Sequence, residues 1–148
     1  MKSVLDRSTR EELTKRIETL NENSTALWGK MNIHQMLQHC ILCEEMFLGR
    51  KKYKRALIGL LFGRIGLRNM LKDDRPLGRN APTSTAFKIK GSDGDMSSDK
   101  MKWISLVDEY SRYDNDEFVH WFFGKMTKEQ VGQFAYKHSD HHLRQFNK

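Results

Sequence analysis

TKEQVGQFAYKHSDHHLRQF, from Thr127 to Phe146, is the stretch of this chain that decides the fold class. Its apolar and histidine side chains recur every three or four residues, the spacing of one face of a helix: Val131, Phe134, Ala135, His138 and His142. Thr127 followed by Gln130 is the signature of a helix capping box. The stretch therefore predicts a helix that opens at Thr127, runs to about Phe146 and turns this face towards a core.

His138 and His142 lie four residues apart on that face. Residues at this spacing are neighbours on a helix, so both imidazoles point the same way into an apolar interior. Burying two imidazoles is costly unless their ring nitrogens find partners, and a transition-metal ion would supply one. The alternative without a metal is a favourable interaction between histidines in the last turns and the helix dipole.

A second amphipathic segment supplies a third histidine. Asn32 and Gln35 repeat the capping signature, and the helix that they open runs to about residue 49. His39 lies at the margin of its apolar face, which consists of Ile33, Met36, Leu37, Cys40, Cys43 and Phe47. Helical bundles build metal sites from such facing side chains, and three imidazoles leave a fourth tetrahedral position open. His39, His138 and His142 are therefore a candidate ligand set for one divalent transition metal, with zinc or nickel favoured over copper or iron.

The remaining segments complete an all-α bundle. They are a first helix opened by a Ser8–Glu11 capping box, a helix over residues 56–71, an irregular connection over 73–95, a third core helix carrying Trp103, Val107 and Tyr110, and an aromatic turn over 118–126. No stretch alternates at period two for long enough to predict a sheet. We expect a single domain over residues 1–148, with four main helices and an elaborated crossover between the second and third.

The composition excludes several classes of protein. Cys40 and Cys43 lie within a predicted helix, so we expect buried, inert thiols and no disulfide framework. The N-terminus has charges where a signal peptide needs an apolar stretch, and the longest apolar run, residues 56–63, is too short to cross a membrane. We expect a cytoplasmic protein without a transmembrane segment.

Residues 50–80 concentrate positive charge, with ten Lys or Arg against two Asp in a chain of net charge +7. Such a segment attracts an anionic substrate, nucleic acid or an acidic membrane surface. No nucleic-acid-binding module frames it, which argues against nucleic acid. The apolar residues 56–67 within it fit an amphipathic helix at a membrane surface, but we expect them to cover the bundle or to pair with another subunit.

Two segments resemble a known superfamily. WGKMNIHQMLQHC (residues 28–40) and FGKMTKEQVGQFAYKHSDHHLRQF (residues 123–146) are similar to a bacterial branch, itself uncharacterised, of the DinB-like superfamily, which includes metal-dependent hydrolases and thiol transferases of the DinB/YfiT type. The similarity is weak over residues 1–24 and 50–95. It implies a DinB-like four-helix bundle, a homodimer, and a metal held by His39, His138 and His142.

The leading interpretation is a metal-dependent enzyme whose ion lowers the pKa of water or of a low-molecular-weight thiol, for hydrolysis or thiol transfer. The basic segment would then contact the anionic groups of a small thiol substrate. One alternative is a non-catalytic metal-binding or interaction protein of a stress response. Another is binding of an anionic surface or nucleic acid through residues 50–80. No general acid or base is identifiable, which leaves the catalytic residues unknown.

The other histidines have separate interpretations. His141 projects about 100° away from His142 and is expected at the surface or behind the ligands. His34 is expected to be exposed or locally bonded, and His120 to be packed and hydrogen-bonded among aromatic residues. Ligating imidazoles usually donate their second N–H to an acceptor. The candidate acceptors are Asp140, Glu44 and Gln145.

Overall fold

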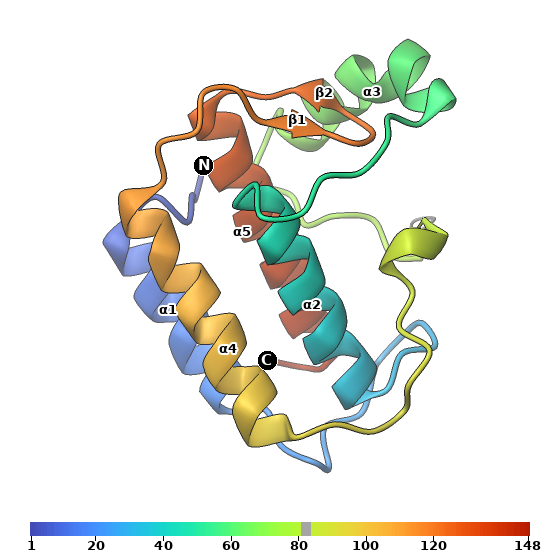
Figure 1. Cartoon of the computed structure of the whole chain (residues 1–148). Helices are drawn as coiled ribbons and strands as arrows, with labels where there is room; N and C mark the ends of the chain where they lie inside the picture. The colour runs from blue at the N-terminus through green and yellow to red at the C-terminus, as the bar shows by residue number, and fades with distance from the viewer. Residues whose placement is uncertain (81–83) are drawn as a thin grey trace.

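Four helices pack into one bundle in the part of the chain that the structure describes, residues 1–80 and 84–148 of a computed structural model. They are α1 (Arg7–Glu18), α2 (Ile33–Phe47), α4 (Met96–Asp108) and α5 (Lys128–Gln145). α1 lies beside α4, and α2 lies beside α5 (Figure 1). Because α4 also contacts α2 and α5 also contacts α1, the helices close a ring around the core. The predicted all-α fold is confirmed.

The inward helix faces predicted from apolar spacing are buried. The side chains almost wholly removed from solvent come from all four helices and include Leu13, Ile17, Met36, Leu37, Phe47, Trp103, Leu106, Val107, Val131, Ala135 and Leu143. Removing apolar surface from water stabilises a fold by about 25 cal/mol per Å². This core therefore holds α2 and α5 in a fixed register, which is the condition for a site shared between them.

Two of the predicted capping boxes are confirmed. At the start of α2 the Gln35 amide donates to Asn32 Oδ1 (2.8 Å), and the Asn32 amide donates to Gln35 Oε1 (3.1 Å). At the start of α5 the Gln130 amide donates to Thr127 Oγ1 (3.2 Å), and the Thr127 amide donates to Gln130 Oε1 (3.0 Å). Each box satisfies two backbone donors that a helix start otherwise leaves unpaired.

The box predicted for the first helix is wrong. α1 begins at Arg7, so Ser8 lies inside its first turn and does not cap it. Glu11 instead accepts a hydrogen bond from Arg7 Nε (2.7 Å). The segment before the helix is held by Arg10, whose Nη1 donates to the Val4 oxygen (2.9 Å). This contact, which no capping pattern encodes, accompanies the earlier start of the helix.

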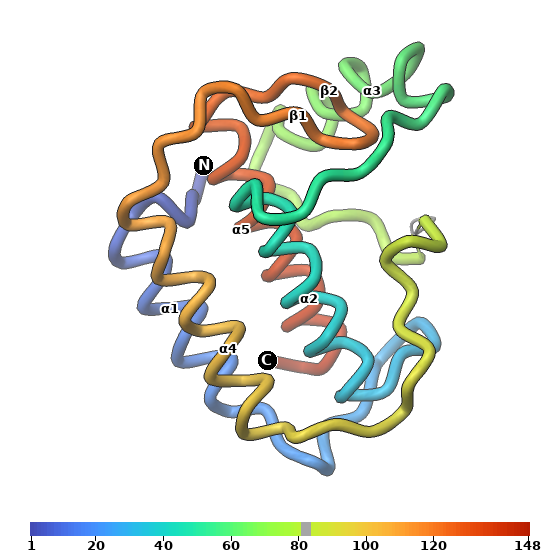
Figure 2. The backbone as a smooth tube through the Cα atoms, in the orientation of Figure 1, coloured from blue at the N-terminus to red at the C-terminus, as the bar shows by residue number. Residues whose placement is uncertain are grey.

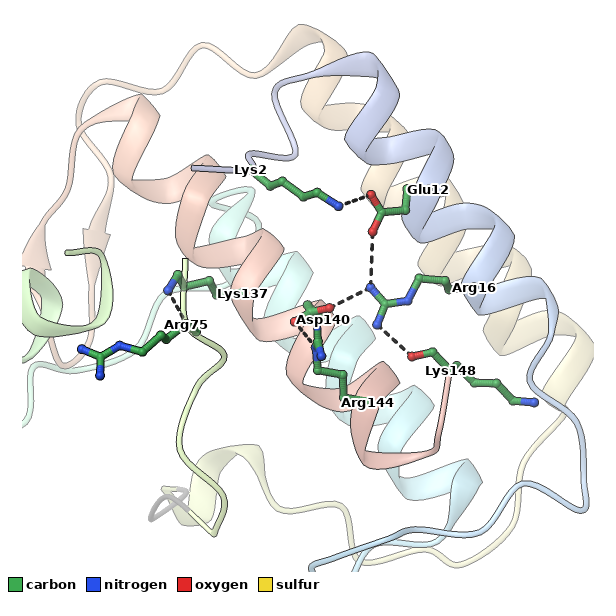
Figure 3. A network of polar contacts seen from close by, with 8 residues as sticks. All are labelled: Lys2, Glu12, Arg16, Arg75, Lys137, Asp140, Arg144 and Lys148. Atoms are coloured by element: carbon green, nitrogen blue, oxygen red, sulfur yellow. Dashed lines mark hydrogen bonds and ion pairs between the residues drawn. The ribbon is translucent and has the colours of Figure 1, made fainter. Parts of the chain in front are cut away.

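The connection between α2 and α4 is long, as predicted. It contains α3 (Leu57–Met70) and a short 3-10 turn, η1 (Thr85–Phe87), while residues 81–83 of the predicted loop lie outside the described residues. Figure 2 shows the chain passing from α3 along the α2–α5 pair, on the side away from α1 and α4. Buried Lys137 of α5 holds the start of this passage, because its Nζ donates to the backbone oxygens of Asp73 (2.6 Å) and Arg75 (2.8 Å; Figure 3).

The aromatic turn over 118–126 is a small antiparallel hairpin, reached from α4 through the 3-10 turn η2 (Glu109–Arg112). Its strands are β1 (Val119–His120) and β2 (Gly124–Lys125), with Val119 opposite Lys125 and His120 opposite Gly124. The sequence did not predict these strands, because two residues are too few to show a period-two pattern. The hairpin closes the end of the bundle at which α5 begins (Figure 1).

α3 packs on the hairpin rather than over the bundle. A Cβ at Gly59 would lie 2.4 Å, and one at Gly63 2.2 Å, from the Phe122 oxygen, so α3 approaches the hairpin backbone more closely than a side chain permits. Leu67 is the large side chain that α3 buries on this face. The expectation that residues 56–67 cover the bundle is therefore wrong, and the alternative, that they pair with another subunit, stays a prediction. Within the described residues, neither α3 nor another helix has the length and apolar character needed to cross a membrane.

Candidate metal centre

Three imidazoles from two helices meet between α2 and α5. His39 of α2 lies with its ring centroid 5.3 Å from that of His138 and 4.8 Å from that of His142. The rings of His138 and His142, both on α5, are 4.7 Å apart. One nitrogen of each ring lies within 4.8 Å of the other two. The structure therefore brings together the three histidines that the sequence singled out.

His142 is oriented by a chain of two hydrogen bonds. Its Nδ1 is 2.9 Å from Gln145 Oε1, and Gln145 Nε2 donates to the Trp28 oxygen (2.7 Å). Because the amide nitrogen must face the Trp28 carbonyl, the amide oxygen faces the ring, so His142 carries its proton on Nδ1 and leaves Nε2 as the free donor atom. Gly29 makes room for this amide: its φ is 83°, and a Cβ there would lie 2.6 Å from Gln145 Nε2.

His39 is oriented by the crossover. Its Nδ1 donates to the Phe87 oxygen (2.9 Å), so Nε2 carries no proton and its lone pair accepts from the thiol of Cys43. The Phe87 ring packs against Tyr53 and Trp121, with centroid distances of 4.7 and 5.7 Å, so the turn that carries this carbonyl is anchored by aromatic contacts. His39 Nε2 also lies 3.7 Å from Cys43 Sγ. The long connection predicted from the sequence thus contacts the site directly.

His138 has a buried nitrogen that the described residues do not satisfy. Its Nδ1 is removed from solvent and has no hydrogen-bond partner among them. The ring packs against Phe47 and Phe134, at centroid distances of 5.6 and 6.5 Å. Leaving such a polar atom unpaired costs about 1–3 kcal/mol. An ion coordinated by the three rings fits this arrangement, because it would occupy the interior on which the imidazoles converge.

All three imidazoles are held neutral. Burial lowers the pKa of His39, and it lowers the pKa of His142 to about 3, with proximity to His39 as a further cause. The pKa of His138 is also well below its usual value, first through burial and then through the neighbouring His142 and His39. Metal ions bind the neutral form of histidine. The bundle therefore presents these side chains in the form that coordinates a metal at physiological pH.

Of the three predicted acceptors, Gln145 accepts from a site histidine and the other two are engaged elsewhere. Asp140 lies between Arg16 Nη1 (2.8 Å) and Arg144 Nε (2.7 Å; Figure 3), which ties α1 to α5. Glu44 accepts from Tyr110 (2.6 Å) and Ser139 (2.8 Å) in the core. The sequence missed Phe87 because the acceptor is its backbone carbonyl, which no residue type reveals.

The other histidines lie outside this group. His141 packs edge-on against Trp28, with ring centroids 5.7 Å apart, and is partly buried. His34 is partly buried, and its Nε2 is 3.0 Å from Glu22, which lies before α2, so its contact is not a local one. His120 accepts at Nδ1 from the backbone amides of residues 122 and 123 (3.1 and 3.2 Å), which confirms its packed, hydrogen-bonded role.

Comparison with known proteins places the chain in a family. A family of proteins of unknown function, DUF1569, matches residues 2–148. This chain belongs to DUF1569. The match includes all three histidines and also the residues over which the DinB-like resemblance is weak. No curated protein and no solved structure matches the chain. The chemistry of this DUF1569 protein therefore has to be argued from its own residues.

A groove runs beside the histidine group of this DUF1569 chain. Its lining residues are Leu27, Trp28, Pro76, Leu77, Arg79, His141, Arg144, Asn147 and Lys148. The Arg79 guanidinium lies 4.3 Å from the centroid of the Trp28 ring, a cation–π contact. His39, His138 and His142 do not line this groove, but His141 does, and its ring lies 5.1 Å from that of His142. The groove thus places cationic and aromatic groups next to the site, because its lining residue His141 precedes His142 in the chain.

Proposed function

We propose that His39, His138 and His142 bind one divalent transition metal, zinc or nickel, and that the protein is a metal-dependent enzyme of the DinB-like type. The proposal rests on the hydrogen bonding of the ring nitrogens. Two imidazoles donate Nδ1–H to fixed acceptors and keep Nε2 unprotonated, which is the usual arrangement of ligating histidines. The third has a buried nitrogen without a partner among the described residues.

The donor set suits these metals. Neutral imidazole is a preferred ligand of zinc and nickel, and three such ligands leave a position for water or substrate. Ligand nitrogens around one zinc ion lie about 3.3 Å apart, given bond lengths of about 2.0–2.1 Å. The three nitrogens lie within 4.8 Å of one another, so the rings would have to move closer together to share one ion.

The reaction proposed is hydrolysis or transfer of a low-molecular-weight thiol. When bound, the ion supplies Lewis acidity that lowers the pKa of water or of a thiol towards neutrality. The chain contributes the orientation of the ligands through Gln145 and the Phe87 carbonyl. The aromatic rings of Phe47 and Phe134 exclude water from one side of His138.

A small anionic thiol is the proposed substrate class. Arg79 and the groove beside His141 support it, because a guanidinium on an aromatic ring is a recognition group for carboxylates. Arg50 and Lys51 of the basic segment are less suited, since they pair with Glu109 and Glu45. If this assignment is right, Arg79→Ala raises KM more than it lowers kcat.

Metal content tests the proposal. Protein purified without a metal-affinity tag is expected to carry about one ion per chain by elemental analysis, and the His142→Ala variant to carry almost none. His141→Ala is the matched control, because it removes the adjacent imidazole without removing a proposed ligand. Equal metal content in the native protein and the His142→Ala variant would contradict the proposal. Cys43→Ala separates a three-histidine site, which keeps its metal, from one that needs the nearby thiol.

A second candidate function is a non-catalytic metal-binding protein. It is favoured by one observation: among the described residues, no carboxylate joins the three histidines as an evident acid or base. Stoichiometric metal without turnover in thiol-transfer and hydrolysis assays would support it. The cytoplasmic location, the single domain over residues 1–148 and the homodimer stay predictions.

A further inference from the structure

α3 exposes an unusually apolar surface. Six of its 14 residues are large hydrophobic side chains that are more than half exposed: Leu57, Ile58, Leu60, Leu61, Phe62 and Ile65. We call them the apolar face of α3. Leu57 is 82% exposed and Leu61 is 74% exposed. Contiguous apolar patches on soluble proteins usually mark sites of interaction with another protein or with a membrane.

This exposure follows from the way α3 is held. Its other face contacts the hairpin through Gly59 and Gly63, which approach the Phe122 backbone too closely for a side chain. Rotating the helix to bury the apolar face would place large side chains in that contact. The core of the bundle is also complete without them, since none of the six belongs to the buried hydrophobic cluster, to which α3 contributes Leu67. The apolar face therefore needs a partner from outside the fold.

Positive charge borders the apolar face. A groove beside it is lined by Arg64, Leu67, Arg68, Leu71, Lys72, Gln130 and Gln133. Its three cations form no ion pair with other described residues. Lys52 and Lys54, before the helix, are likewise exposed, and no acidic residue occurs between residues 50 and 72. The groove is thus positively charged, and its Arg64 and Arg68 lie on the same helix as the apolar face.

We propose that α3 docks this protein on an anionic lipid bilayer. The helix lies in the plane of the interface, with its apolar face among the upper acyl chains. The groove receives a lipid phosphate, with Arg64, Arg68 and Lys72 supplying the charge. Gln130 Oε1 is occupied by its capping bond, which leaves its amide N–H groups free to donate to the phosphate oxygens.

Charge complementarity favours a bilayer over a second copy of this chain. A two-fold dimer through this surface would bring the positive charge of residues 50–72 of both copies into one interface. The chain has a net charge of +7, and nothing in residues 50–72 offers a compensating acid. An anionic leaflet complements both the cationic groove and the apolar face, because it combines negative phosphates with an apolar interior.

Vesicle sedimentation tests the proposal on the full chain. Vesicles of phosphatidylcholine containing about one-third phosphatidylglycerol are expected to bind the protein at least about tenfold more tightly than vesicles of phosphatidylcholine alone. Binding should weaken as salt rises from about 0.1 M to about 0.5 M, because salt screens the charges. Inorganic phosphate should compete weakly, since it cannot cover the apolar face.

Two double variants test the cationic groove and the apolar face separately. Arg64→Gln with Arg68→Gln should weaken binding several-fold and flatten the salt dependence. Leu61→Asn with Ile65→Asn should weaken it at both salt concentrations. Met101→Asn and Arg112→Gln are matched controls, since both side chains are exposed on other elements and should leave binding unchanged. All these positions are exposed, so circular dichroism should report native folding in every variant.

Three results would overturn the proposal. The first is equal affinity for both kinds of vesicle at low salt. The second is a dimer in ultracentrifugation that dissociates in the Leu61→Asn, Ile65→Asn variant, which would assign the face to a second copy. The third is phosphate binding as tight as vesicle binding, which would reduce the site to the groove alone.

Discussion

The α2–α5 pair and α3 each place side chains where such side chains are uncommon, but the two regions do so in opposite ways. The α2–α5 pair buries polar groups, among them His39, His142, Glu44 and Lys137. α3 exposes apolar ones, with Leu57 and Leu61 the most exposed. In the α2–α5 pair most of these polar groups have a partner within the chain, whereas the apolar face of α3 is exposed. We propose that a metal ion occupies the interior of the histidine group and that a lipid bilayer covers the apolar face.

Glu44 allows the largest test of the buried polar region. Burial raises the pKa of Glu44 to about 7, from 4.5. The folded protein therefore holds this proton more tightly than the unfolded chain, so the stability it contributes is fully present below about pH 4.5 and is lost as pH rises to about 7. Because glutamine does not ionise, the Glu44→Gln variant does not lose this stability as pH rises. Between about pH 5 and about pH 8, the free energy of unfolding of the variant should rise relative to the native protein by about 2.5 kcal/mol.

Urea unfolding of metal-free protein at both pH values measures this difference. The histidines titrate in the same way in both proteins, so their contributions cancel. Glu18→Gln, an exposed change, is the control and should show no such pH dependence. A Glu44→Gln variant whose stability parallels that of the native protein at both pH values would show that the buried carboxyl ionises without cost.

Gln145 tests whether the hydrogen bonds behind the site matter for metal binding. Gln145→Ala removes the acceptor of the His142 Nδ1 proton. Loss of such a partner typically lowers metal affinity by about 10- to 100-fold. Competition with a chelator measures the affinity, and Gln133→Ala on the same helix is the control. Gly29→Ala should act in the same direction, because its Cβ would displace the Gln145 amide. Unchanged affinity in both variants would mean that the ring is held by packing alone.

Gly63 tests the attachment of α3. A Cβ at Gly63 would lie 2.2 Å from the Phe122 oxygen, so Gly63→Ala should push the helix off the hairpin. We expect a net cost of about 1–2 kcal/mol, since overpacking outweighs the better helix propensity of alanine. Thermal unfolding measures it, and metal content should stay unchanged. Gly66→Ala is the control: its nearest neighbour, a Phe123 ring carbon, is 3.6 Å away, so this variant should be slightly stabilised.

Leu61 has the smallest predicted effect on stability. Because its side chain is 74% exposed, Leu61→Ala should change the free energy of unfolding by less than about 0.5 kcal/mol. Denaturant unfolding at low protein concentration measures it. A loss of several times that size would show that the apolar face packs within the chain, and would remove the contrast between the two regions.

Much of the bundle and the site was predictable because the signals are local. Helical spacing identified the buried faces of α2 and α5, and two capping boxes located the starts of these helices. The same spacing placed His138 and His142 on one inward face. The Ser8–Glu11 box failed because contacts from Arg10 hold the segment before α1, and a capping pattern does not contain them.

The partners of the site were not predictable because they are distant and lack a side-chain signature. The Phe87 carbonyl lies 48 residues from His39 along the chain, and the Trp28 carbonyl lies 117 residues from Gln145. Any residue supplies a carbonyl, so only the folded chain shows which one is within reach. Of the predicted acceptors, Asp140 and Glu44 have suitable chemistry but are bonded to other groups.

By itself the sequence determined the fold class, the inward faces of α2 and α5 and the three histidines, because periodicity and residue chemistry are properties of neighbouring residues. The tertiary structure alone decided which ring nitrogen of His39 and of His142 is unprotonated, and which face of α3 packs against the hairpin. An apolar helix has the same pattern whether its apolar face is buried or exposed. The close approach of Gly59 and Gly63 to the Phe122 backbone determines that the apolar face of α3 is the exposed one.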